Sequence, residues 1–191
     1  MRNLLVYACL LILLVAGVLV YNYSNHITMN GSNASAAPME LRIPRMHVDA
    51  PVINVGATAS GQMDAPVSNA VNSPYWTSVF WYDLGAAPGQ AGNAVIAGHV
   101  DRVGGDPAVF WSLSSLQRGD SIFVTTGNKD ELKFVVDRVV NYPAASPGKE
   151  ALQAVFGPTT AHHLNLITCS GAWTANGYDQ RLVVFSTQAN V

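Results

Sequence analysis

The chain has 191 residues, enough for one domain of ordinary size and an appendage. Its formal net charge is −2, and this near-neutral balance argues against a nucleic-acid-binding surface or a polybasic membrane patch. Only 12% of the residues are charged, and part of the apolar excess is concentrated near the N-terminus.

The N-terminal apolar run covers residues 4–20 and contains no charged residue, Asn, Gln or Pro. As a helix it would span about 26 Å, enough to cross the bilayer core with little tilt. Arg2 precedes the run and no Lys or Arg follows until Arg42, so the positive-inside rule predicts a cytoplasmic N-terminus. We therefore expect a single transmembrane anchor over residues 1–21, with the rest of the chain extracytoplasmic. A cleaved signal peptide is the alternative, but the Ala-Ser-Ala of residues 34–36 lies unusually far beyond the run.

The chain has two cysteines, and they differ in their surroundings. Cys9 lies inside the apolar run, where a cysteine behaves as a small apolar residue. Cys169 then has no disulfide partner in the outer part of the chain. In an exported protein, a leftover cysteine indicates intermolecular pairing or a reactive thiol.

The part after the anchor divides into a linker and one domain. Residues 22–38 are rich in Asn, Ser and Ala and lack Lys, Arg, Asp and Glu, which predicts a flexible linker. Residues 39–191 contain short apolar runs separated by Gly, Pro, Asn and Asp. This pattern predicts an all-β domain, a closed or nearly closed barrel of about seven or eight strands. The expected strands are residues 41–43, 52–55, 94–98, 121–125, 131–142, 164–168 and 181–186, with a hairpin turn at 126–130 and short helices at 107–116 and 149–156.

Cys169 follows the expected strand at 164–168, where the sequence becomes polar up to Gly171. On an extended strand it shares one face with Asn165 and Ile167. A buried core cysteine is the simplest interpretation of such a residue. A thiol at the end of a strand can, however, project into a cleft while the strand holds its backbone rigid.

His99 comes directly after the expected strand at 94–98. Taken alone, it is as well explained by a core or turn histidine as by an acid–base catalyst. Asp101 lies two residues later, so in an extended segment both side chains face the same side and the carboxylate could orient the imidazole. It could equally pair with Arg102 or cap the following turn.

Arg181 begins the last expected strand. A surface ion pair with Asp179 or Asp137 would be worth little, whereas a fixed guanidinium aimed at a reaction centre could stabilise an oxyanion. Metal binding is not expected, because no spaced set of Cys and His completes a zinc site and the adjacent His162 and His163 would point in opposite directions.

Together, these residues resemble the sortase family. The family has a Thr-Leu-x-Thr-Cys-like strand, an upstream histidine and an arginine that opens the last strand; here these are Asn165-Leu-Ile-Thr-Cys169, Gly98-His99 and Arg181. Asn165 stands where the family motif often has Thr, and the segment from Cys169 to Arg181 is slightly short. Further segments resemble the class E and F sortases of actinobacteria, class F most closely: Leu41-Arg-Ile-Pro44, Gly61-Gln-Met-Asp-Ala-Pro66, the stretch from Pro88 to Asp101, and Leu116-Gln-Arg-Gly-Asp120.

The resemblance implies an eight-stranded sortase β-barrel and a cysteine transpeptidase. Cys169 would attack the Thr–Gly bond of a Leu-Pro-x-Thr-Gly-like sorting signal and form a thioester. His99 would protonate the leaving amine and deprotonate the incoming one, and Arg181 would stabilise the oxyanion. Thr168 and Asp101 are further candidate substrate-binding residues. The expected partners are secreted proteins with such signals and an amine acceptor of a Gram-positive cell wall, and the chemistry needs no cofactor or metal.

Three other classes compete with this interpretation. An L,D-transpeptidase would carry a Ser-x-Gly-Cys-type motif, which the sequence lacks. A papain-like peptidase places its cysteine before its histidine, the reverse of the order here. The third alternative is a non-catalytic extracytoplasmic β-barrel that serves in adhesion or assembly.

Overall fold

The structure is a computed structural model that describes residues 37–189. The expected anchor at residues 1–21 lies outside the described residues, as does nearly all of the expected linker. Within residues 37–189, no helix has the length and apolar character needed to cross a membrane.

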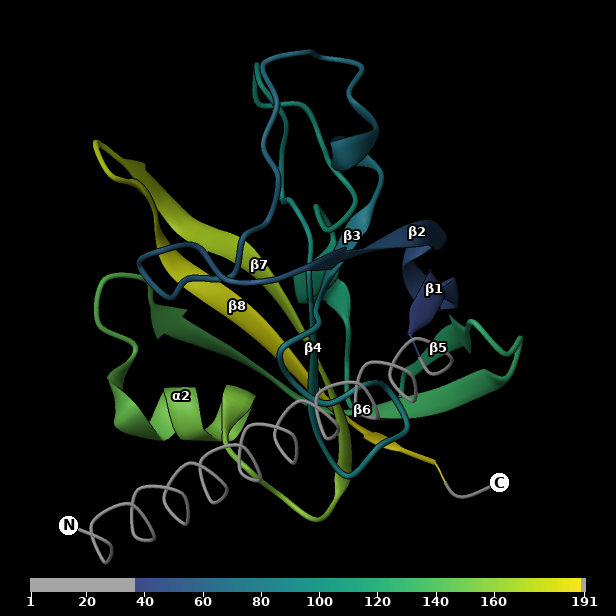
Figure 1. The fold of residues 1–191 in the computed structure, drawn as a ribbon. Helices are drawn as coiled ribbons and strands as arrows, with labels where there is room; N and C mark the ends of the chain where they lie inside the picture. The colour runs from purple at the N-terminus through teal and green to yellow at the C-terminus, as the bar shows by residue number, and fades with distance from the viewer. Residues whose placement is uncertain (1–36, 190–191) are drawn as a thin grey trace, which may run out of the picture. The chain divides into compact units, whose positions relative to one another are not determined.

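Eight strands close into a barrel in the order β1-β2-β3-β4-β7-β8-β6-β5, which confirms the predicted all-β architecture (Figure 1). Neighbouring strands are antiparallel except for the pairs β2–β3 and β4–β7, which are parallel. The strands are β1 (Pro38–Ile43), β2 (Val48–Val55), β3 (Val79–Tyr82), β4 (Gly92–Ala97), β5 (Ser121–Thr126), β6 (Glu131–Pro143), β7 (His162–Thr174) and β8 (Gly177–Gln188), and the helical elements are η1 (Pro44–Met46), η2 (Pro74–Trp76), η3 (Leu113–Ser115) and α2 (Gly148–Phe156).

One strand was not predicted, and one predicted helix does not form. The strand β3 was not predicted, because its four residues are all apolar and carry no alternation to mark a strand. The helix expected at 107–116 is wrong: only the single 3₁₀ turn η3 forms there. Phe110 and Leu113 are fully buried in the barrel core, and the backbone N–H of Phe110 donates to His99 instead of building a helix.

The β7–β8 hairpin is longer than the sequence indicates. β7 continues past Cys169, and β8 begins before Arg181, so both residues lie within strands and not at strand boundaries. The pairing register shifts between Ser170 and Trp173, which marks a bulge. The polar residues beyond Cys169 remain in the strand because the backbone groups of β7 and β8 form hydrogen bonds with each other along the hairpin.

The side chains of β4, β7 and β8 alternate between the barrel interior and an outer face. Leu164 and Leu166 of β7 belong to the interior core, whereas Ile167 packs in a second apolar cluster with Val183 of β8. The helix α2 adds Val155 to this second cluster. The helix therefore covers the outer face of the same strands that carry the candidate catalytic residues.

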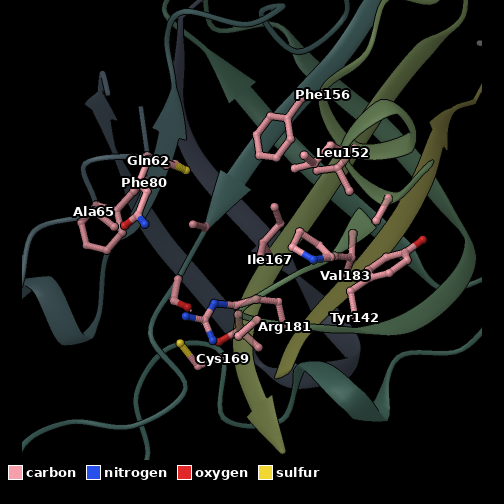
Figure 2. A pocket seen from close by; sticks show the side chains of 18 of the residues that line it. Gln62, Ala65, Phe80, Tyr142, Leu152, Phe156, Ile167, Cys169, Arg181 and Val183 are labelled. Atoms are coloured by element: carbon pink, nitrogen blue, oxygen red, sulfur yellow. Dashed lines mark hydrogen bonds between the residues drawn. The ribbon is translucent and has the colours of Figure 1, made fainter. Parts of the chain in front are cut away.

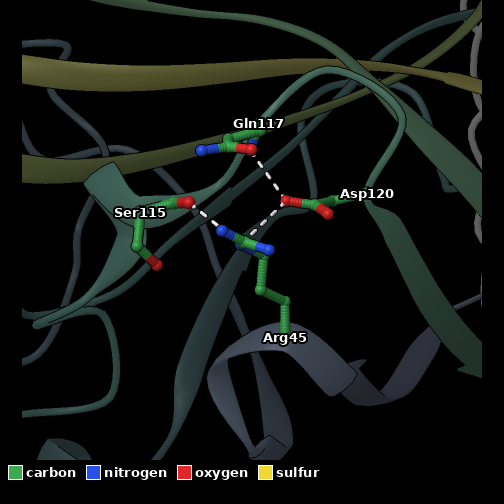
Figure 3. A network of polar contacts seen from close by, with 4 residues as sticks. All are labelled: Arg45, Ser115, Gln117 and Asp120. Carbon is green, nitrogen blue, oxygen red and sulfur yellow. Dashed lines mark hydrogen bonds and ion pairs between the residues drawn. The ribbon is translucent and has the colours of Figure 1, made fainter.

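A polar network joins η1 to the turn before β5 (Figure 3). Arg45 Nε donates to the carbonyl of Ser115 at 3.1 Å and pairs with Asp120 Oδ2 at 3.3 Å. The same carboxylate accepts the backbone N–H of Gln117 at 2.7 Å. Since the Arg45 side chain is 44% exposed, this network orders the turn more than it stabilises the fold.

Candidate active site

A pocket of about 630 Å³ lies on the outer face of the barrel, between α2 and the strands β4, β7 and β8. Its lining includes His99, Cys169 and Arg181, three residues that the sequence analysis singled out. Figure 2 shows Cys169 and Arg181 at one end of the pocket and the α2 residues Leu152 and Phe156 toward the other. Reactive groups and an apolar wall therefore share one cavity.

Cys169 and Arg181 occupy paired positions in the antiparallel β7–β8 ladder. Directly opposed residues project from the same face of a sheet, and here that face borders the pocket. Arg181 Nη1 donates to the carbonyls of Tyr178 at 3.1 Å and Gln180 at 2.9 Å, which holds the guanidinium from its own strand.

Neither candidate ion-pair partner of Arg181 is used. Asp179 accepts the backbone N–H of Ala172 at 2.8 Å, and Asp137 accepts the hydroxyl of Thr187 at 2.7 Å. Within residues 37–189, the guanidinium of Arg181 forms no salt bridge. Its charge is therefore not neutralised by a described carboxylate and acts on the pocket.

His99 lies just beyond the end of β4 in an aromatic enclosure. Its ring packs edge-on against Trp76 and Phe80, with centroid separations of 4.9 and 5.4 Å. Its Nε2 lies 2.8 Å from the carbonyl oxygen of Pro66. A carbonyl can only accept, so Nε2 carries a hydrogen and Nδ1 is the nitrogen that can take up or release a proton.

Thr168 also lines the pocket, and its hydroxyl is already used within the fold. Its hydroxyl donates to the carbonyl of Gly98 at 2.8 Å, and the residue is only 5% exposed. A hydroxyl has one hydrogen, so this side chain has none left to give to an oxyanion. The bond instead fastens the residue before His99 to the residue before Cys169.

Asp101 binds Tyr178, and no hydrogen bond joins it to His99 among the described residues. The phenol of Tyr178 donates to Asp101 Oδ2 at 2.6 Å, which links the segment after β4 to β8. This hydrogen bond raises the pKa of Tyr178 to about 12, so the phenol remains a donor throughout the neutral range. Sequence reasoning missed Tyr178, whose only signal was an aromatic residue shortly before Arg181.

The thiol of Cys169 is half-buried, and its surroundings act in opposite directions. Burial raises the pKa of Cys169, the positive charge of Arg181 lowers it, and the negative charge of Asp101 raises it again. Burial is the largest effect, so the pKa lies above the ordinary value of a cysteine. The resting site thus holds mainly the neutral thiol near neutral pH.

The other described histidines lie outside the pocket. His47 adopts a left-handed backbone conformation, with φ 53°, directly after η1. His162 Nδ1 lies 2.9 Å from the carbonyl of Gly89, and His163 Nδ1 lies 3.1 Å from the hydroxyl of Thr187. In the described part of the chain, no three His, Cys, Asp or Glu side chains come together as metal ligands.

Comparison with known proteins identifies the domain. Residues 41–189 match the family model described as the Sortase domain. Among solved structures, sortase C-1 from Actinomyces oris has 19% identity and a TM-score of 0.58, over 80% of this chain and 73% of that one. A Clostridium perfringens sortase D5 transpeptidase has 19% identity and a TM-score of 0.57, over 81% of this chain and 79% of that one.

A lid mutant of sortase A from Corynebacterium diphtheriae has 18% identity and a TM-score of 0.58, over 80% of this chain and 69% of that one. No curated protein matches the chain. At these identities the solved structures show the fold alone. They carry class A, C and D names, so the class E or F assignment stays a prediction.

Proposed function

The chain belongs to the sortase family of cysteine transpeptidases, and we propose that it cleaves a Leu-Pro-x-Thr-Gly-like sorting signal between Thr and Gly. It then joins the new C-terminus to an amine acceptor of the cell wall. The observation that carries this proposal is that Cys169, His99 and Arg181 line the same pocket. We assign them the roles of nucleophile, proton carrier and oxyanion stabiliser.

In the first half-reaction, the thiol proton of Cys169 passes to Nδ1 of His99, which gives a thiolate and an imidazolium. The thiolate attacks the carbonyl carbon of Thr, and Arg181 stabilises the oxyanion with the guanidinium hydrogens that its own strand does not use. Collapse breaks the Thr–Gly bond, and the imidazolium gives its proton to the leaving amine. The product is a thioester on Cys169.

In the second half-reaction, neutral His99 accepts a proton from the incoming amine as its nitrogen attacks the thioester carbon. Collapse of the second tetrahedral intermediate expels the Cys169 thiolate and leaves a new amide bond. The imidazolium then returns its proton to the thiolate. The thioester divides one difficult amide exchange into two easier steps, and the proton count is restored after each turnover.

The apolar end of the pocket suits the Leu-Pro part of the signal. Leu152 and Phe156 of α2 line it and remain 51% and 44% exposed. Ile167 and Val183 continue this apolar lining toward Cys169 (Figure 2). A peptide with its scissile bond at Cys169 can cover this exposed apolar surface with its upstream side chains.

The proposal also places the protein in the cell membrane as a single-pass protein with an extracytoplasmic catalytic domain. The uncharged run at residues 4–20, preceded by Arg2, supports it. After cell lysis the protein should then be found in the membrane fraction. Protease added to intact cells should remove the catalytic domain. A protein released to the medium without its N-terminus would contradict the anchor.

The catalytic proposal is tested with full-length protein purified in detergent and a fluorescent Leu-Pro-x-Thr-Gly peptide. We expect cleavage between Thr and Gly, and an acylated Cys169 detected by mass spectrometry when no amine is added. Cys169→Ala should abolish both. Equal processing of a peptide library by wild type and Cys169→Ala would refute the mechanism.

A further inference from the structure

A buried pair of amide side chains connects the strands of the site to the C-terminal end of α2. Asn165 Nδ2 donates to Asn93 Oδ1 at 3.0 Å and to the carbonyl of Val155 at 2.9 Å. Asn93 Nδ2 donates to the carbonyl of Gly157 at 2.7 Å. Asn165 is 1% exposed and Asn93 is 9% exposed, so water cannot replace these contacts.

These bonds satisfy carbonyls that the helix cannot satisfy itself. The last carbonyls of an α-helix have no partner within it, and α2 ends at Phe156. Val155 is in the last turn, and its side chain is packed against the sheet. A buried carbonyl without a hydrogen-bond donor would destabilise the fold. The side-chain amides of the two strands provide these donors at the C-terminal end of the helix.

The position of the pair relates α2 to the reactive thiol. Asn165, Ile167 and Cys169 alternate along β7 and therefore share its outer face. Apolar packing of Val155 would allow α2 to slide over this face, whereas hydrogen bonds from Asn165 hold it at one position. The position of α2 sets the distance between Cys169 and the apolar side chains of Leu152 and Phe156, which line the same pocket.

An amide is required here because both of its hydrogens are used. Asn165 gives one hydrogen to Asn93 and the other to Val155, whereas a threonine hydroxyl has a single hydrogen. Asn165 Oδ1 is buried and has no hydrogen-bond partner among residues 37–189. The chain therefore tolerates an unsatisfied acceptor in order to keep the two donations, which indicates that the donations matter.

We propose that Asn165, together with Asn93, is a positioning residue that sets the width of the pocket between α2 and β7. It thereby determines the affinity for the apolar part of the sorting signal without taking part in the chemistry. The choice of ligand rests on the proposed function, whereas the positioning of α2 does not. The asparagine where the family motif often has threonine is then a determinant of specificity.

The test compares Asn165→Thr and Asn93→Ala with wild type in the full-length protein, and Ser186→Ala serves as the matched control. Ser186 is fully buried and donates to the carbonyl of Leu164 at 2.6 Å, so its hydrogen bond is made to β7. Amide hydrogen exchange of residues 152–157 reports the helix end. KM and kcat for the Leu-Pro-x-Thr-Gly peptide report the pocket.

We expect both asparagine variants to exchange about tenfold faster over residues 152–157. Their KM should rise about fivefold, the effect of losing one net hydrogen bond, with kcat within about twofold of wild type. Ser186→Ala should change neither exchange at α2 nor KM. Asn93→Ala removes part of the same hydrogen-bond network from β4. If Asn165→Thr does not fold, the results for Asn93→Ala test the inference.

Two results would overturn the inference: unchanged exchange at α2 in the folded variants, or an equal rise in KM for Ser186→Ala, which would reveal general destabilisation. If wild type cleaves no such peptide, the proposed function has failed. The exchange measurement then decides alone whether the amide pair positions α2.

Discussion

Cys169 and Arg181 face each other across the β7–β8 ladder, so the strand register itself holds the guanidinium beside the thiol. The arginine lowers the pKa of Cys169, yet burial outweighs it and the net pKa is raised. Asp101, fastened by Tyr178, adds to the rise. The reactivity of the thiol thus depends on three effects, two of which can be altered by single substitutions.

The first prediction concerns the pH dependence of Cys169 alkylation. Because a raised pKa favours the neutral thiol, the rate with iodoacetamide should increase with pH and reach its midpoint above that of a free cysteine. Asp101→Asn removes a negative charge and should lower the midpoint, and Arg181→Gln removes a positive charge and should raise it. Shifts of both variants in the same direction would contradict this electrostatic account.

The second prediction concerns the phenol of Tyr178. Its pKa of about 12 depends first on the hydrogen bond to the Asp101 carboxylate. The tyrosinate absorbance of Tyr178 is obtained by subtracting the titration curve of Tyr178→Phe from that of wild type. This difference should stay flat up to about pH 11, whereas an ordinary tyrosine titrates near 10. In the Asp101→Asn background the same difference should appear at a lower pH, because the negative charge that disfavours the tyrosinate is gone while the effect of burial remains. Identical midpoints in both backgrounds would rule out the bond as the cause.

The third prediction concerns Gly98, which precedes His99. A Cβ at this position would stand 2.5 Å from the ring of Phe110, which is fully buried and cannot move away. Gly98→Ala should destabilise the fold by about 1 to 3 kcal/mol and reduce activity by displacing His99. Urea unfolding measures the first effect. Gly56→Ala is the control, because its nearest atom would be 4.0 Å away, and a comparable loss there would contradict the argument.

The fourth prediction concerns the pair Arg45–Asp120, which lies far along the chain from Cys169. A double-mutant cycle with Arg45→Ala and Asp120→Ala should give a coupling of about 0.5 kcal/mol, since the pair is partly exposed. The coupling should decrease in high salt. Each single substitution should cost more than this coupling, because Arg45 also donates to the Ser115 carbonyl and Asp120 also accepts the backbone N–H of Gln117. A salt-independent coupling of several kcal/mol would contradict the surface-pair interpretation.

Several features could be predicted from the sequence because they depend on local pattern. Alternating apolar residues predicted the β-barrel, and the helix expected at 149–156 is α2. The pattern failed at β3, where an all-apolar run gives no period, and at 107–116, where Phe110 enters the core instead of a helix. In both places burial by distant strands overrides the local signal.

The positions of the site residues show the same division. Alternation along β7 predicted that Asn165, Ile167 and Cys169 share a face, and Ile167 and Cys169 both line the pocket. Alternation could not predict that the Thr168 hydroxyl binds Gly98 across the parallel β4–β7 pair. Such a contact depends on strand order, which is a property of the whole chain.

By itself, the sequence determined which reactive groups exist, their order along the chain and the alternation that directs them to one face or the other. The tertiary structure alone decided that Asp101 binds Tyr178, that two asparagines hold the end of α2, and that burial outweighs Arg181 at Cys169. Hydrogen-bond partners and pKa shifts depend on which distant segments pack together and on how much water they exclude. Local sequence patterns do not reveal which distant segments will pack together.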